Sequence, residues 1–182
     1  MLRLPFSGLS APRRAPALML PAMLAAALAL SGCENSQDRA ERYYQSGMQL
    51  LAQGEPERAM IEFRNVFTYD GFHKEARKAF ADTLLAQGNA SSAYSQYLRL
   101  IEQYPDTPEV RRTLAEIAIG RGDWAEAERH GRAALALTPD DLAVQAVGAA
   151  LEYRAAVLAT DPEATRLAVA ATQTVLERLP QH

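Results

Sequence analysis

Hydrophobic and polar positions alternate at helical spacing through most of this 182-residue chain. Between residues 40 and 141, apolar side chains recur every three or four positions, as they do on the buried stripe of an amphipathic helix. Glycine or proline interrupts this stripe at regular intervals. The pattern therefore predicts an all-α chain of short helices joined by tight turns.

The interruptions follow one period of 34 residues. The positions that repeat include Gly54, Gly88 and Gly122, then Ala59, Ala93 and Ala127, and then Gly71, Pro105 and Pro139. Four further sets, which begin at Gly47, Leu50, Phe63 and Val66, keep the same register. Chance agreement at seven positions is improbable, so the sequence predicts three helix-turn-helix units over residues 40–73, 74–107 and 108–141.

The repeated positions have physical roles. The glycines fall where the first helix of a unit ends, and the left-handed backbone of a C-cap costs glycine no Cβ clash. Glu55, Asn89 and Asp123 follow directly, and each offers an oxygen that can cap the second helix. Thr107 is expected to cap the first helix of the third unit. The shared core is expected from apolar positions at helical spacing, namely Leu50, Leu51, Ile61, Phe63, Val66 and Phe67.

A fourth, less regular helix pair is expected over residues 142–182. The spacing from Pro139 to Pro180 is 41 residues, which exceeds the period by two helical turns, so one or both helices should be longer. The sequence holds no polar capping helix after this pair. Repeat arrays normally need one, so either a partner covers the last apolar face or the chain is a truncated form of a longer array.

The three regular units resemble the tetratricopeptide repeat. The usual pattern of that helix-turn-helix unit has a small residue in the first helix, a small residue and an aromatic in the second, and a closing proline. The resemblance implies a right-handed α-solenoid over residues 40–182, with three regular units and one irregular C-terminal pair. In such solenoids the first helices build a concave face that binds a protein or peptide partner.

The resemblance also assigns candidate binding residues, at repeat positions 5, 9 and 12. In this chain they are Tyr44, Met48, Leu51, Lys78, Asp82, Leu85, Arg112, Glu116 and Ile119. The charges are mixed, and two opposite-charge pairs stand four residues apart, so an ordinary solvated helix face explains them as well. A clamp for a C-terminal carboxylate is not expected, because Asp82 and Glu116 would repel one. Tyr44, Met48 and Leu51 instead offer an apolar patch for an amphipathic helix.

Residues 1–32 have a different composition from the rest. They contain three arginines and no acidic residue, and their apolar run from Ala15 to Leu30 is alanine-rich and interrupted by proline. A membrane-spanning helix needs about 20 unbroken apolar residues, so an export signal is favoured over a permanent anchor.

The end of this segment, Leu30-Ser31-Gly32-Cys33, resembles the bacterial lipobox. The resemblance implies that residues 1–32 form a cleaved lipoprotein signal peptide and that Cys33 is acylated. Residues 33–39 would then be the lipidated end and a polar tether. An ordinary secretory signal, or an N-terminal helix with a buried thiol, is the alternative. The residue after the cysteine is Glu34 and not the aspartate of inner-membrane retention, so the outer membrane facing the periplasm is favoured, with the inner membrane left open.

Charge and residue counts exclude several classes of function. The chain has 19 basic and 22 acidic residues, which argues against a nucleic-acid binder, and one cysteine, which excludes an internal disulfide. His73, His130 and His182 form no metal-spaced pair, and the glycines mark helix turns, so no metal, cofactor or catalytic residue is expected. His130 is expected to be a packed or surface side chain.

Together these features predict a non-enzymatic, membrane-anchored scaffold in the bacterial cell envelope. It would mediate protein–protein interactions during the assembly of envelope complexes. The alternative is an accessory or regulatory subunit of a polysaccharide-export or cell-wall enzyme system.

Overall fold

The structure, a computed structural model, describes residues 35–178. The chain divides into Met1–Asn35 and Ser36–His182, and every described helix belongs to the second unit. The expected signal segment and Cys33 lie outside the described residues. The described part is all-α, and its helices are α2 (Ser36–Ala52), α3 (Pro56–Tyr69), α4 (Lys74–Ala86), α5 (Ala90–Gln103), α6 (Pro108–Arg121), α7 (Trp124–Leu137), α8 (Leu142–Leu158) and α9 (Pro162–Arg178).

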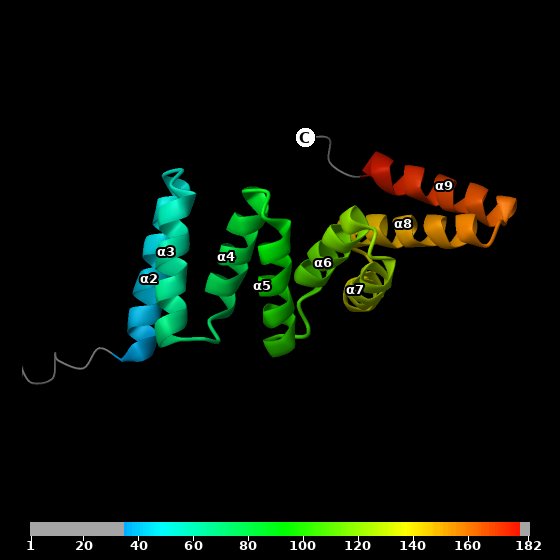
Figure 1. The fold of residues 1–182 in the computed structure, drawn as a ribbon. Helices are drawn as coiled ribbons and strands as arrows, with labels where there is room; N and C mark the ends of the chain where they lie inside the picture. Colours follow the sequence, from blue (N-terminus) through cyan, green and yellow to red (C-terminus); the bar gives the residue numbers. More distant parts are fainter. Residues whose placement is uncertain (1–34, 179–182) are drawn as a thin grey trace, which may run out of the picture. The chain divides into compact units, whose positions relative to one another are not determined.

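The helices form antiparallel pairs that follow one another along the chain (Figure 1). Within the pairs α2 packs on α3, α4 on α5, α6 on α7 and α8 on α9. Neighbouring pairs meet through α3 with α4, α5 with α6 and α7 with α8. This arrangement confirms the expected α-solenoid of helix pairs. In the last pair both helices have 17 residues, against 13 or 14 in α3 to α7, so the extra length is shared between them.

The glycine turns have the expected geometry. Gly54, Gly88 and Gly122 have φ values of 76°, 77° and 71°, which is the left-handed region that an L side chain rarely adopts. Their N–H groups, or those of the next residue, bond back to the last turn of the preceding helix, which ends each first helix of the three regular units.

The predicted helix caps are only partly correct. Asn89 accepts a hydrogen bond from the backbone N–H of Ser92, and Asp123 accepts one from Glu126. Glu55 occupies the N-cap position of α3 but accepts no backbone hydrogen bond there, because its longer side chain reaches Arg58 instead. Thr107 precedes α6, yet its buried hydroxyl donates to the carbonyl oxygen of Tyr104 at 2.7 Å.

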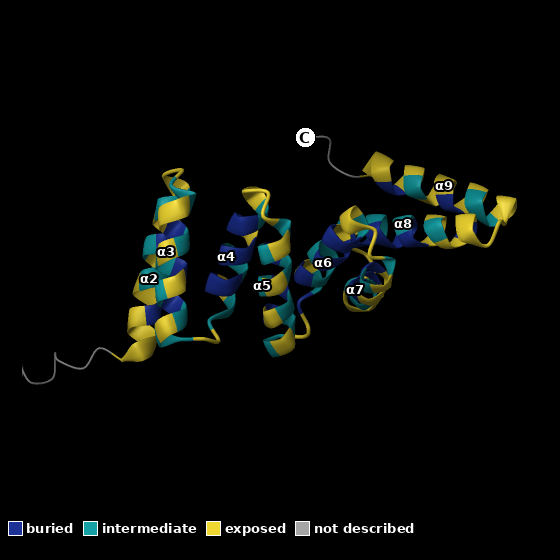
Figure 2. Ribbon diagram, viewed as in Figure 1, coloured by how far each residue is buried: buried dark blue, intermediate teal, exposed yellow. Residues whose placement is uncertain are grey.

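Burial follows the repeats, with one exception among the expected core residues. Ala59, Ala93 and Ala127 are fully buried, which confirms that small side chains let the paired helices approach closely. Ile61 was expected in the core but is 54% exposed, because it lies about half a turn around α3 from the buried Phe63. Figure 2 shows that buried positions are dense on α4 and α6 and sparse on α9.

The third unit packs differently because Gly131 stands where the other units have an aromatic. A Cβ at Gly131 would lie 2.8 Å from a methyl group of Leu151 and 3.0 Å from one of Val147. The space left by the missing ring is therefore filled from α8. As a result α8 contacts α6 as well as α7, and Ala115, Ala118, Val147 and Leu151 belong to a second core cluster.

A repeated hydrogen bond joins the first helices α4, α6 and α8 to the loops before them. The side chain at position 4 of a unit donates to the backbone carbonyl six residues earlier. Arg77 donates through Nη2 to Gly71 at 2.7 Å, Arg111 through Nε to Pro105 at 2.8 Å, and Gln145 through Nε2 to Pro139 at 2.8 Å. These acceptors are the residues that close each unit in the 34-residue ladder, so the bond fixes one unit on the next.

The N-terminal boundary differs from the expected one. The first helix begins at Ser36 and not at Ala40, so residues 36–39, expected as tether, continue α2 by about one turn. Asp38 lies in that first turn, where a negative charge is favourable to the helix dipole. The repeat pattern marks where packing against α3 begins, and the helix itself starts earlier.

Candidate functional site

The nine predicted binding residues lie at matching positions on α2, α4 and α6. In each helix they are separated by four and then three residues, so they share one helix face. We call these nine residues the first-helix surface: Tyr44, Met48, Leu51, Lys78, Asp82, Leu85, Arg112, Glu116 and Ile119. Each row of the surface has one member per unit and its own level of exposure.

The rows at repeat positions 9 and 12 differ in how far their side chains are exposed to a partner. Met48 is 39% exposed, and Asp82 and Glu116, at the same repeat position, are also exposed. Leu51, Leu85 and Ile119 are half-buried and pack against the core clusters, so they stabilise the fold as well. The exposed row is therefore the part of the surface that a partner reaches first.

The charged residues of the surface are paired within their own helices. Lys78 Nζ lies 2.8 Å from Asp82 Oδ2, and Arg112 Nη1 lies 2.5 Å from Glu116 Oε1. The buried Tyr97 of α5 donates its hydroxyl to Asp82 Oδ1 at 2.7 Å. Burial raises the pKa of Tyr97, and the bond to Asp82 raises it further, so the phenol stays a donor. Asp82 is thus held in place by α4 and α5 together.

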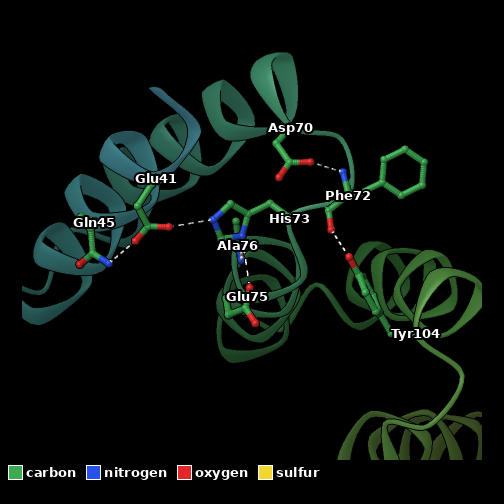
Figure 3. A network of polar contacts seen from close by, with 8 residues as sticks. All are labelled: Glu41, Gln45, Asp70, Phe72, His73, Glu75, Ala76 and Tyr104. Atoms are coloured by element: carbon green, nitrogen blue, oxygen red, sulfur yellow. Dashed lines mark hydrogen bonds and ion pairs between the residues drawn. The ribbon is translucent and has the colours of Figure 1, made fainter. Parts of the chain in front are cut away.

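A polar network fixes the apolar end of the surface (Figure 3). Gln45 donates to Glu41 at 2.6 Å, and Glu41 lies 3.3 Å from His73 Nε2. His73 caps α4, because its Nδ1 accepts the backbone N–H of Ala76 at 3.2 Å. With Nδ1 as the acceptor, Nε2 carries the proton and donates to Glu41. His73 therefore links α2 to the start of α4.

The loop of residues 70–73 is also held from the other side. Asp70 accepts the N–H of Phe72 at 2.9 Å, and the hydroxyl of Tyr104 donates to the carbonyl of Phe72 at 2.5 Å. The exposed Phe72 ring points away from this network (Figure 3). The sequence showed no metal role for His73, and its capping role could have been found from its place directly before the second unit.

Tyr44 contacts this network through its ring. Its centroid lies 5.0 Å from the ring of His73 and 6.3 Å from that of Phe63. Burial raises the pKa of Tyr44, and the carboxylates of Glu75 and Glu41 raise it further. The side chain is thus an anchored, neutral aromatic, which suits a contact residue because little rotamer entropy remains to be lost.

A second network surrounds the buried His130 of α7. His130 was expected to be packed or on the surface; it is 1% exposed and therefore packed, and its Nε2 lies 3.3 Å from Glu126 Oε2. The hydroxyl of Tyr94 donates to the same oxygen at 3.1 Å, and burial raises the pKa of Tyr94 to about 12. Burial, and then the positive charge of Arg129, lower the pKa of His130. Within residues 35–178 its Nδ1 has no hydrogen-bond partner, which fits a neutral ring.

Two further observations concern membranes and metals. Over residues 35–178, no helix has the length and apolar character that crossing a bilayer requires. In the same part of the chain, no group of three or more His, Cys, Asp and Glu side chains could hold a metal ion.

Comparisons place this fold among known proteins. Residues 50–117 match the family model of the tetratricopeptide repeat, and no curated protein matches the chain in sequence. MamA of Desulfovibrio magneticus RS-1 is similar in structure, with a TM-score of 0.61, 18% identity, and coverage of 76% of this chain and 74% of that one. The TPR domain of Arabidopsis OM64 gives a TM-score of 0.59 and 12% identity, with coverage of 66% and 99%.

YrrB, described as a TPR protein with an unusual peptide-binding site, gives a TM-score of 0.52 and 22% identity. The match covers 68% of this chain and 61% of YrrB. At these identities the structural likeness shows the fold, and the fold supports a protein–protein interaction scaffold. Residues 50–117 therefore carry the tetratricopeptide-repeat pattern, and the described part of the chain folds as an α-solenoid similar to those of the compared proteins.

Proposed function

We propose that this protein is a lipid-anchored periplasmic scaffold that docks partner proteins on the first-helix surface during the assembly of envelope complexes. The observation that carries the proposal is the exposed row of Met48, Asp82 and Glu116, one residue from each of three successive units. A partner segment that runs along this row meets each unit at the same helix position.

The chemistry of the surface indicates the kind of segment that fits. At the α2 end, Tyr44 and Met48 offer an apolar contact, whereas α4 and α6 offer charges of both signs. An amphipathic helix with one apolar anchor and mixed charges would complement both parts. The description of YrrB as a peptide-binding protein of the same fold supports this mode of recognition.

In-cell crosslinking tests the docking surface. A photo-crosslinking amino acid would replace Met48 or Glu116, and as a control Ala136, which is exposed on α7. We expect the first two positions to give adducts with one and the same envelope protein, identified by mass spectrometry, and the control to give none. Tyr44→Ala with Arg112→Ala should remove those adducts. Adducts that survive this double variant, or that form equally at Ala136, would overturn the proposal.

The anchor is tested separately. Bacteria that produce the protein would be fed an alkyne fatty acid, and labelling of the wild type would be compared with that of Cys33→Ala. We expect labelling to disappear in the variant and the protein to leave the outer-membrane fraction. Undiminished labelling would contradict acylation at Cys33, and it would leave the crosslinking result to stand by itself.

A further inference from the structure

A second groove lies between α3 and α5, with α4 as its floor. Its lining includes three arginines and two aromatic rings, and none of its lining residues is acidic. We call it the arginine groove, and the residues that define it are Arg64, Phe67, Arg77, Phe80 and Arg99. The chain as a whole has a formal net charge of −3, so the groove is locally positive on a chain that is negative overall.

The arginine groove is separate from the first-helix surface. On α4, the groove residues Arg77, Phe80 and Leu84 occupy repeat positions 4, 7 and 11. The first-helix surface uses positions 5, 9 and 12 of the same helix. At 3.6 residues per turn, the centres of these two sets are about 130° apart around the helix axis. A partner on one surface therefore leaves the other free.

Arg77 places a buried positive charge at the floor of the groove. Its side chain is only 7% exposed, and its guanidinium carbon lies 4.5 Å from the ring centre of Phe67. Nη1 donates to Gln96 at 3.0 Å and Nη2 to the Gly71 carbonyl, but Nε has no hydrogen-bond partner among the described residues. All of its acceptors are neutral, so no carboxylate within residues 35–178 compensates this charge, and an anion that entered the groove would be stabilised.

Arg64 and Arg99 stand on the two walls and are exposed. Arg64 lies over the ring of Phe80, 5.6 Å from its centre, and neither side chain forms an ion pair with a carboxylate in the described part of the chain. Other arginines do pair with an acidic residue of the same repeat, namely Arg58, Arg112, Arg129, Arg132 and Arg166. The groove arginines are therefore available to carboxylates from outside.

We propose that the arginine groove binds an acidic segment of a partner protein. Carboxylates of the segment pair with Arg64 and Arg99, and an apolar side chain between them packs on the half-buried Phe67. Arginine suits this role because its planar group binds a carboxylate through two parallel hydrogen bonds. The ring of Phe67 favours a peptide over a lipid headgroup, because a headgroup brings charge but no apolar side chain to pack on the ring. This site goes beyond the first-helix surface and is independent of the anchor.

The test uses the full-length protein and a defined probe. The probe is a fluorescent eight-residue peptide in which glutamates alternate with phenylalanine and leucine, and binding is followed by fluorescence anisotropy. We expect Arg64→Gln with Arg99→Gln to weaken binding about tenfold or more. The matched control is Arg58→Gln with Arg132→Gln, which removes the same charge from exposed sites elsewhere and should change the dissociation constant less than about twofold. Both substituted pairs are exposed, and circular dichroism would verify that each variant folds.

Changes to the peptide, the salt concentration and the binding partner distinguish this proposal from its alternatives. A peptide with glutamine in place of glutamate should bind at least about tenfold more weakly. Added salt should weaken the binding of the acidic peptide. Equal losses in the groove and control variants would mean non-specific charge attraction and would overturn the proposal. Binding to phosphatidylglycerol vesicles that needs Arg64 and Arg99, without binding to the peptide, would assign the groove to lipid instead. Dimers of the protein that the groove variant abolishes would assign it to a second copy.

Discussion

The first three helix pairs and the last pair, α8 with α9, bury their apolar residues to different extents. The helix α4 packs against α3 and α5 and buries six residues, whereas the longer α9 buries Ala168 and Val175. Most of the large hydrophobic side chains that are exposed within residues 35–178 lie on the last pair, namely Tyr153, Val157, Leu158, Leu167, Val169 and Leu176. An element with packed neighbours on both sides gains core contacts that a flanking element lacks.

The turns of the two regions also differ, because the turn of the last pair has the more strained backbone. Each regular unit turns through a glycine with positive φ, but between α8 and α9 the corresponding residue is Thr160, with a φ of 56°. A β-branched side chain is unfavourable there. Weak burial and a strained turn together indicate that the last pair is the least stable part of the described solenoid.

The largest difference is expected from matched core truncations. Val66 is fully buried on α3, so Val66→Ala should lower the free energy of unfolding by about 2–3 kcal/mol. Val175 on α9 is a buried residue of the last pair, and Val175→Ala should cost about 1 kcal/mol. Urea denaturation followed by circular dichroism measures both. Equal costs would show that α9 is as firmly packed as the first pair.

Lowering the pH should destabilise the protein at His130, which lies on α7, the helix that packs against α8 of the last pair. Its pKa is lowered by burial and by Arg129, with an opposing contribution from Glu126. The unfolded chain therefore binds more protons than the folded chain as the pH falls below the ordinary value of 6.5. The free energy of unfolding should be highest above that pH and should decrease between about pH 6.5 and 5.

The variant His130→Phe separates this effect from other acid effects. The carboxylates around it are unchanged, so the difference in pH slope between wild type and variant belongs to the imidazole. We expect the wild type to lose more stability than the variant between pH 7 and 5. Parallel slopes would mean that His130 does not titrate differently in the two states.

Exchanging the turn residues should produce smaller changes of opposite sign. Thr160→Gly relieves the left-handed strain and should raise the free energy of unfolding by about 0.5 kcal/mol, after the entropy cost of glycine. Gly88→Ala introduces the same strain into a regular turn and should cost about 1 kcal/mol. Hydrogen exchange in α8 and α9 would locate the first effect. Destabilisation by Thr160→Gly would contradict the strain interpretation.

The sequence predicts the features that repeat and misses those that do not. The helix pairs and the glycine turns depend on local spacing and backbone geometry, and both are confirmed. The failures are local: Glu55 bonds to Arg58, three residues further along the chain, and not to a backbone N–H of the helix N-terminus, and Ile61 lies on the outer face of α3. The contact of Glu55 depends on the length of its side chain, which the repeat spacing does not describe. The expectation for Ile61 was wrong because 3.6 residues per turn put it about half a turn from Phe63.

The arginine groove shows the same limit at a candidate site. Arg64 and Arg99 occupy positions 25 and 26 of their own units, and Arg77 occupies position 4, so a search for residues in register does not group them. They meet because α3, α4 and α5 pack together, across a boundary between units. The first-helix surface was predictable by contrast, since its members do stand in register, although its role in binding stays a prediction.

The smallest effect is expected from the exposed apolar face of α9. Leu167 is 60% exposed, so Leu167→Gln should change the free energy of unfolding by less than about 0.5 kcal/mol. Ala168 is buried beside it, and Ala168→Gln would force a larger side chain against α8 and serves as the positive control. If Leu167→Gln instead costs as much as a core truncation, then this face is covered in solution. A dependence of that cost on protein concentration would identify the cover as a second copy, because only association responds to concentration.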